Sequence, residues 1–215
     1  MWPVLTELQY GGEMAKRKSN PGDVLKRLLS VAVRAAQAAE VPYAIGGALA
    51  MQAHGLSRST KDVDIFVAPD HAFALLRALR VLGMTVVPIF EPHHYAAYFP
   101  NTVDPEERID VMVPAGEPEL SAIEWSETKT IFGTRVEVFP LDLLVFAKGY
   151  AMRPKDELDL AMMMARGMFD PRQVSELIRS VDPDGADEFD SAIQRITRPT
   201  PPRRSTQTRL PPRKR

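Results

Sequence analysis

Cysteine is absent from the 215 residues of this chain. Its absence excludes disulfides and thiolate metal sites, so only carboxylates and the four histidines could hold a metal. Long apolar runs are lacking too, because none reaches the roughly 18 residues of a membrane-spanning helix. The first 20 residues lack the apolar stretch and cleavage site of a secretory signal. We therefore expect a cytoplasmic protein with no membrane partner.

Positive charge is sparse in most of the chain and concentrated at its C-terminal end. Residues 197–215 hold seven of the 27 Lys and Arg residues and no acid, which leaves 20 basic against 28 acidic residues in positions 1–196. The same segment contains five prolines and almost no apolar residues, so we expect a disordered basic tail. Such a tail either stays solvated or contacts the phosphates of a nucleic acid.

A hydrophobic content of 45% and a charged content of 26% are typical of a globular protein. Residues 1–20 are polar and without periodicity, which predicts a disordered leader, or a true start at Met14. Strands and helices mix over 21–139, and helices alone follow over 140–196. This order predicts an α+β fold, a mixed β-sheet with flanking helices followed by a helical C-terminal bundle.

Hydrophobic periodicity, caps and turn residues place the individual elements. Helices are predicted from Pro21 to the Val41-Pro42 step, over 48–54, from Pro69 to Gly83, and over 141–152, 155–167, 171–181 and 184–196. Strands are predicted over 43–45, 63–67, 84–90, 95–99, 108–113, 128–132 and 135–139.

Two glycines, Gly46 and Gly47, stand between the short strand 43–45 and the helix that begins at Ala48. Glycine lets the backbone approach a ligand closely, and the free N–H groups of a helix start favour an anion. Simple packing of a strand against a helix would use the same two residues. The pair alone therefore leaves both interpretations open.

Two aspartates, Asp62 and Asp64, open the next predicted strand. Residues two apart on a strand share a face, while Val63 and Ile65 between and after them point to the opposite face. Two adjacent carboxylates repel each other unless a cation lies between them, and Mg²⁺ prefers oxygen ligands. Asp-x-Asp pairs are also common in loops without a metal.

The order of strand, Gly46-Gly47, helix, Arg58 and then Asp62-x-Asp64 on a strand resembles the nucleotidyltransferase superfamily, which includes DNA polymerase beta and the aminoglycoside nucleotidyltransferases. The resemblance implies that the glycines grip a nucleoside triphosphate (NTP) such as ATP. It also implies that the aspartates bind two metal ions with a third carboxylate from a later strand. Asp110, the polar residue of an alternating strand, is the candidate, although a solvent-facing aspartate would fit the same pattern.

The resemblance implies a reaction as well. Two Mg²⁺ ions would hold the α-phosphate of the NTP and activate an attacking hydroxyl. Asp62 and Asp64 would hold both ions, and Asp110 would hold the catalytic one. Arg58 either neutralises the departing pyrophosphate together with the glycine amides or pairs with a surface acid.

A second resemblance lies in residues 141–160, where Lys148 is followed by a Lys-Asp-x-x-Asp segment holding Asp156 and Asp159. This segment is similar to the abortive-infection nucleotidyltransferase toxins of type IV toxin–antitoxin systems. The similarity implies that Lys148 contacts nucleotide phosphate and that Asp159 supports the nucleotide site, with Asp156 a weaker candidate. A salt-bridge cluster between two helices is the alternative.

Three functions are compatible with these patterns. The first is a Mg-dependent nucleotidyltransferase that moves a nucleoside monophosphate to a hydroxyl of RNA or protein, as a toxin with a cognate antitoxin would. The second is a small-molecule nucleotidyltransferase of the antibiotic-modifying kind. The third is a catalytically inactive binding or antitoxin module, against which the intact Asp62, Asp64 and Asp110 argue. His93 and His94, in a proline-flanked loop, could touch a substrate or be inert.

Overall fold

The computed structural model describes residues 20–197, so the predicted leader and basic tail lie outside it except for Asn20 and Thr197. The helices are α1 (Pro21–Ala39), α2 (Gly47–Ala53), α3 (Pro69–Val81), α4 (Glu119–Glu124), α5 (Leu141–Ala151), α6 (Pro154–Met164), α7 (Pro171–Val181) and α8 (Pro183–Thr197). The strands are β1 (Ala44–Ile45), β2 (Val63–Phe66), β3 (Thr85–Phe90), β4 (His94–Tyr98), β5 (Ile109–Met112), β6 (Glu127–Ile131) and β7 (Thr134–Val138).

All seven strands belong to one mixed sheet in the order β3-β4-β5-β2-β1-β7-β6. The pairs β2–β5 and β1–β7 are parallel, and the other four are antiparallel. The predicted α+β class is therefore confirmed. The central strands β2 and β5 carry the candidate site at their paired positions.

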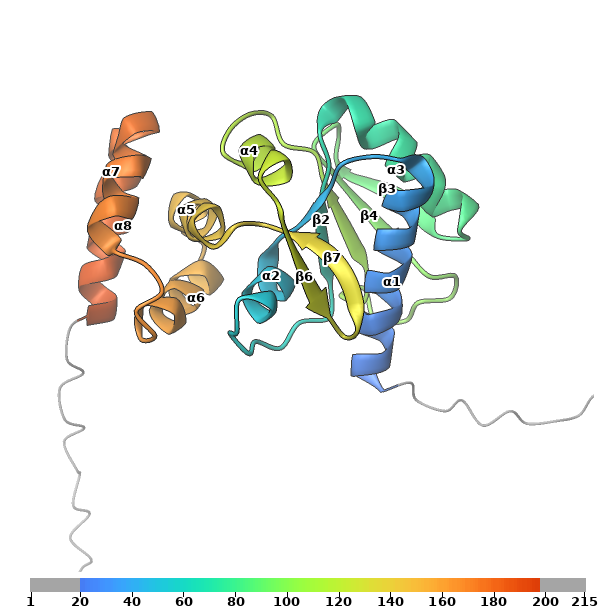
Figure 1. The fold of residues 1–215 in the computed structure, drawn as a ribbon, viewed down its shortest axis with the longest axis horizontal. Coiled ribbons are helices and arrows are strands. Elements are labelled where there is room, and N and C mark those ends of the chain that lie inside the picture. The colour runs from blue at the N-terminus through green and yellow to red at the C-terminus, as the bar shows by residue number, and fades with distance from the viewer. Residues whose placement is uncertain (1–19, 198–215) are drawn as a thin grey trace, which may run out of the picture.

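One face of the sheet is covered by α1 and α3 (Figure 1). Val63 and Ile65 on β2 and Ile109 and Val111 on β5 are fully buried, as the alternation of apolar residues predicted. The helices α2, α4 and α5 lie on the opposite side (Figure 1). The polar residues of the two strands therefore face a second, separate set of helices.

The four C-terminal helices pack on one another beyond α2 (Figure 1). Phe189 of α8 and Ile178 of α7 are fully buried against α5. A Cβ atom on Gly149 of α5 would lie 3.0 Å from both of their side chains, so glycine lets the helices approach closely. The predicted C-terminal bundle is confirmed.

Most predicted helices and strands match the structure to within one or two residues, but two differences matter. The segment 155–167 is helical only to Met164, and Gly167 takes a left-handed conformation with φ of 63°. The short helix α4 was not predicted, because its six residues include only two buried apolar side chains, Ala122 and Ile123. That is too short a segment to show helical periodicity.

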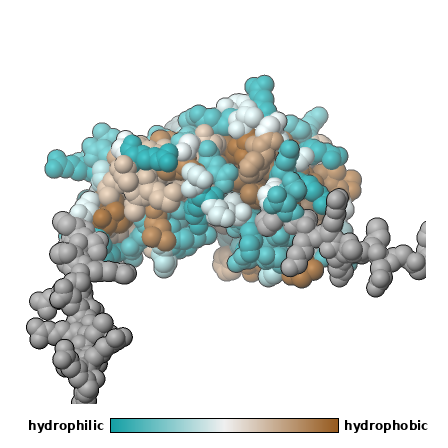
Figure 2. Space-filling view, turned by 90° about the horizontal axis from the view of Figure 1, so that it is seen from below, coloured by the Kyte–Doolittle hydropathy of each residue, from teal (hydrophilic) through white to brown (hydrophobic). Residues whose placement is uncertain are grey.

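Apolar side chains on the molecular surface form separate patches between hydrophilic ones (Figure 2). No helix within residues 20–197 is both long and apolar enough to cross a membrane.

Candidate active site

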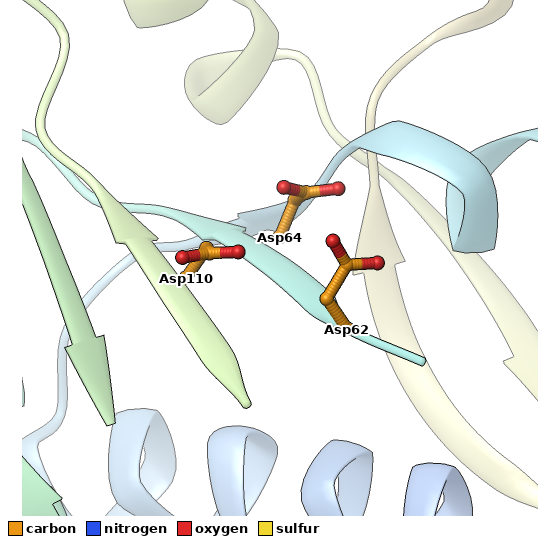
Figure 3. A group of neighbouring side chains, drawn as sticks. All are labelled: Asp62, Asp64 and Asp110. Carbon is orange, nitrogen blue, oxygen red and sulfur yellow. The ribbon is translucent and has the colours of Figure 1, made fainter. Parts of the chain in front are cut away.

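Three carboxylates converge where β2 and β5 run side by side. Asp62 immediately precedes β2, and Asp64 lies within it, directly opposite Asp110 in the parallel pairing with β5. One oxygen from each of the three carboxylates lies within 4.8 Å of the others. Figure 3 shows the side chains pointing away from the sheet face that α1 covers. The structure thus brings together the three aspartates that the sequence singled out.

Asp64 lies in a crowded and buried environment. Burial, followed by the negative charges of Asp62 and Asp110, raises the pKa of Asp64 to about 6. The positive charges of Lys155 and Lys148 oppose this shift. Crowded carboxylates of this kind favour either a proton or a hard cation between them. The donor set, three carboxylates with oxygens in mutual reach, fits a divalent ion such as Mg²⁺.

Gly47 lies in direct contact with Asp64. A Cβ atom at position 47 would be 1.8 Å from Oδ2 of Asp64, and the residue has a φ of +56°. At Gly46, a Cβ atom would lie 2.5 Å from the Phe66 ring, and the Gly46 N–H donates to the Asp64 carbonyl at 3.0 Å. A side chain at either position would therefore overlap a side chain of β2. The first turn of α2 begins beside the carboxylates as a result.

Asp110 is 3% exposed and is held by two hydrogen-bond donors, His94 and Arg108. The sequence did not link either residue to Asp110. Oδ1 of Asp110 accepts hydrogen bonds from His94 Nε2 and Arg108 Nε, both at 2.8 Å, and Arg108 Nε lies 3.0 Å from Oδ2. The hydrogen bond to Asp110 also raises the pKa of Arg108. Both oxygens of Asp110 therefore have donors, and the carboxylate stays within reach of Asp62 and Asp64.

The loop prediction for His94 was wrong, because β4 begins at this residue rather than at Tyr95. Antiparallel pairing sets Ala96 opposite Asp110, so His94 lies on the same face two residues away. The signal for Arg108 was present in the sequence, since alternation puts residues 108 and 110 on one face. The signal for His94 required the register between two strands.

Lys148, Asp156 and Asp159 form a buried ion cluster between α5 and α6. Lys148 Nζ lies 2.5 Å from Oδ2 of Asp159 and 3.3 Å from Oδ1 of Asp156. Arg58 Nε reaches Oδ1 of Asp159 at 3.0 Å, and Arg153 Nε reaches Oδ2 of Asp156 at 2.6 Å. Although burial opposes ionisation, the bonds from Arg153 and Lys148 hold the pKa of Asp156 below its usual range. The acid that Arg58 pairs with is therefore buried and not on the surface.

A cavity of about 230 Å³ lies between the carboxylates and the C-terminal helices. Asp62 and Asp64 line it together with Gly47 and with four cationic side chains: Arg58, Lys148, Arg153 and Lys155. Gly46, Asp110 and Asp159 do not line it, but each contacts a residue that does. Anionic phosphates are the groups that such a set of cations beside a metal site would hold.

The fold has known structural counterparts. The chain superimposes on the crystal structure of ANT(2″)-Ia in complex with adenylyl-2″-tobramycin with a TM-score of 0.56 and 18% identity, covering 80% of this chain and 99% of that one. The chain has the nucleotidyltransferase fold. The solution structure of the same antibiotic-resistance factor matches with a TM-score of 0.51 and 17% identity, over 81% of this chain and 92% of the other. No protein-family model and no curated protein matches the sequence.

Within this nucleotidyltransferase fold, the residues that would hold divalent ions are Asp62, Asp64 and Asp110. Thr60 donates a hydrogen bond to Oδ1 of Asp62 and so fixes its orientation. His94 and Arg108 do the same for Asp110. The outer donors of a metal site commonly set the geometry of its ligands.

Proposed function

We propose that the protein transfers a nucleoside monophosphate from an NTP to a hydroxyl group, in a reaction that depends on two Mg²⁺ ions. The observation that carries the proposal is the convergence of Asp62, Asp64 and Asp110 beside a cavity walled by cations. Carboxylates for the metals and cations for the phosphates are the two requirements of this chemistry. The nucleotidyltransferase fold supports the same proposal.

Asp62 and Asp64 would hold both ions, and Asp110 one. The ions, once bound, supply charge neutralisation at the α-phosphate and activate the attacking hydroxyl. Arg58 and Lys148 would bind the β- and γ-phosphates, and Asp159 would hold these two cations in place, since its two oxygens contact one each. This combines both interpretations of the cluster, as an interhelical ion pair and as part of the nucleotide site.

The acceptor would enter through a second hollow that adjoins the cavity. A polar hollow of about 370 Å³, lined by Lys61, Glu106 and Arg108, meets the cavity at Thr60 and Asp62. In-line displacement needs the attacking hydroxyl opposite the departing pyrophosphate, which the cationic wall would hold. The hollow shares Asp62 with the cavity but is lined by none of the four cations of that wall, so it would receive the hydroxyl.

Two acceptor classes have support. The basic segment 197–215 favours RNA, and with it the toxin hypothesis in which RNA or protein is modified and a cognate antitoxin restrains the enzyme. The likeness to ANT(2″)-Ia, whose complex contains adenylyl-2″-tobramycin, favours a small molecule with a hydroxyl group. The intact carboxylate cluster argues against a catalytically inactive binding module.

One experiment tests the reaction and sorts the acceptors. The full chain is incubated with α-labelled NTPs, Mg²⁺ and, in separate arms, total RNA, cell protein and a panel of aminoglycosides. We expect label in one arm, and expect Asp62→Asn with Asp64→Asn to abolish it. Asp70→Asn, at an exposed aspartate on α3 across the sheet, is the matched control. Labelling that survives the double substitution would overturn the two-metal proposal.

A further inference from the structure

The cavity beside the carboxylates has two chemically different ends. Asp62, Asp64 and Phe66 share one face of β2, so Phe66 lies about 13 Å along the chain from Asp62. On α5, Leu144 lines the cavity one turn before Lys148, which lies on the side that leads to α6. In Figure 1 α4 lies above α5 and α6 below it. The cations gather near α6, and the end near α4 is apolar, formed by Phe66, Met112, Phe139 and Leu144.

Glu119 is the carboxylate at this apolar end. It is the first residue of α4, which packs against α5, and it follows the end of β5 at Met112 by seven residues. Its side chain is half-buried and lines the cavity, and burial raises its pKa. No cationic side chain in residues 20–197 forms an ion pair with it. A half-buried carboxylate without a cationic partner would accept hydrogen bonds from donor groups of a ligand.

We propose that the apolar end binds the nucleobase of the NTP and that Glu119 selects guanine. The inference rests on the proposed function, which puts the phosphates between Asp64 and the cations. The nucleoside must then extend away from that wall, where the partly exposed Phe66 and Met112 offer a surface for the faces of a base. Phe139 and Leu144, which are 1% and 2% exposed, support this surface from within the core. The polar hollow beside Arg108 contains no apolar side chain, so it cannot serve the same purpose.

The choice of guanine follows from the edges of the bases. An ionised carboxylate has two acceptor oxygens and no donor. Guanine presents two adjacent donors, N1–H and the 2-amino group, that fit both oxygens at once. Adenine and cytosine present an amino group beside a ring-nitrogen acceptor, and the single N–H of uracil lies between two carbonyls. In each of these three cases an acceptor of the base would face a carboxylate oxygen of Glu119.

The test measures equilibrium binding of non-hydrolysable GTP, ITP and ATP analogues to the full chain with Mg²⁺. We expect the GTP analogue to bind about 10- to 100-fold more tightly than the ATP analogue, as a charge-assisted pair of hydrogen bonds would give. The ITP analogue, which lacks the 2-amino group, should fall between them. Glu119→Gln should abolish the preference for guanine while the ATP analogue still binds, which also demonstrates a folded cavity. Glu124→Gln, at an exposed residue of the same helix, should keep the preference.

Several results would overturn the inference. Equal affinities of the unaltered protein for the three analogues would do so, as would a preference for guanine that survives Glu119→Gln. Tobramycin binding is measured alongside, and a Glu119→Gln variant that changes only the affinity for tobramycin would assign Glu119 to an acceptor. In all three cases the proposed function stands if label from the NTP is still transferred. A chain that binds none of the analogues and transfers no label contradicts both proposals.

Discussion

Gly47 and Asp64 occupy adjoining space so closely that any side chain at position 47 would overlap the carboxylate. A Cβ atom at position 47 would lie 1.8 Å from Asp64 Oδ2, and the Gly47 backbone has a φ of +56°. Gly47, which we expect to bind phosphate, is thus also required for Asp64, a candidate metal ligand, to keep its position. Substitution at Gly47 should therefore lower the affinity for metal more than the affinity for nucleotide.

Gly47→Ala should reduce Mn²⁺ affinity at least tenfold, because Asp64 must move to make room. Gly55→Ala is the matched control, since Gly55 also has a positive φ, of +88°, but nothing lies within 4 Å of its Cβ position. Both variants should lose about 1 kcal/mol from the left-handed backbone. Electron paramagnetic resonance of Mn²⁺ and thermal unfolding measure the two effects. Equal Mn²⁺ affinity in the two variants would contradict the steric role of Gly47.

Asp64→Asn should stabilise the protein in the absence of divalent metal at pH 8. The pKa of Asp64 in the folded state, about 6, exceeds its ordinary 3.8, so the folded state binds the proton more tightly than the unfolded state. Stability contributed by this group is therefore present at low pH and is lost as pH rises through 6. The difference corresponds to about 3 kcal/mol at pH 8.

Urea unfolding in a chelator at pH 8 and pH 5 measures this effect. The advantage of Asp64→Asn over the unaltered protein should shrink by about 1.4 kcal/mol at pH 5, where the folded-state carboxyl is mostly protonated. Mg²⁺ at pH 8 should stabilise the unaltered protein and leave the variant nearly unchanged. An advantage that does not vary with pH would mean that the carboxylates are not crowded as described.

His94→Ala should raise the Mg²⁺ concentration needed for half-maximal transfer by about 10- to 100-fold, the usual effect of removing an outer donor from a metal ligand. His94 acts through Asp110, 2.8 Å away, and does not line the nucleotide cavity. The KM for the NTP should therefore change little, while kcat at fixed Mg²⁺ falls. His94→Gln, which keeps a donor, should restore part of the loss.

His93→Ala is the control for this prediction, because within residues 20–197 the His93 ring makes a hydrogen bond only with the Val113 carbonyl, at 3.1 Å. The ratio of kcat to KM is measured across a Mg²⁺ titration for all three variants. If His94→Ala changed only the KM for the NTP, Asp110 would not depend on His94 for its orientation.

The sequence predicted those parts of the site whose signal is local. Asp62 and Asp64 lie two residues apart before and within an apolar strand, and the glycine pair follows a strand of its own, so their geometry follows from strand and turn rules. The contact between His94 and Asp110 depends on the register of β4 against β5, which no short segment encodes. Glu119 was missed for a related reason, since α4 is too short to have a periodic pattern.

The cluster at Lys148 lies between these two cases. The spacing of Lys148, Asp156 and Asp159 suggested a unit, but the sequence could not distinguish an ion pair from a nucleotide contact. The structure resolves the geometry because Arg58, 101 positions before Asp159, also pairs with Asp159. The segment between α2 and β2 is thus joined to α6 by an ion pair between the partly exposed Arg58 and the buried Asp159 at the candidate site.

Lys148→Met should destabilise the protein by about 1–3 kcal/mol, because the buried Asp159 and Asp156 each lose one partner and keep only Arg58 and Arg153. Lys148→Met combined with Asp159→Leu should cost less than the sum of the single changes, since it removes both members of one pair. Urea unfolding of the three variants in a double-mutant cycle measures the coupling. If the proposed phosphate contact is correct, the double variant should recover stability yet keep a KM for the NTP raised about tenfold or more, because the lost charge lines the cavity. Recovery of both stability and KM would mean that Lys148 serves only in the ion pair between α5 and α6.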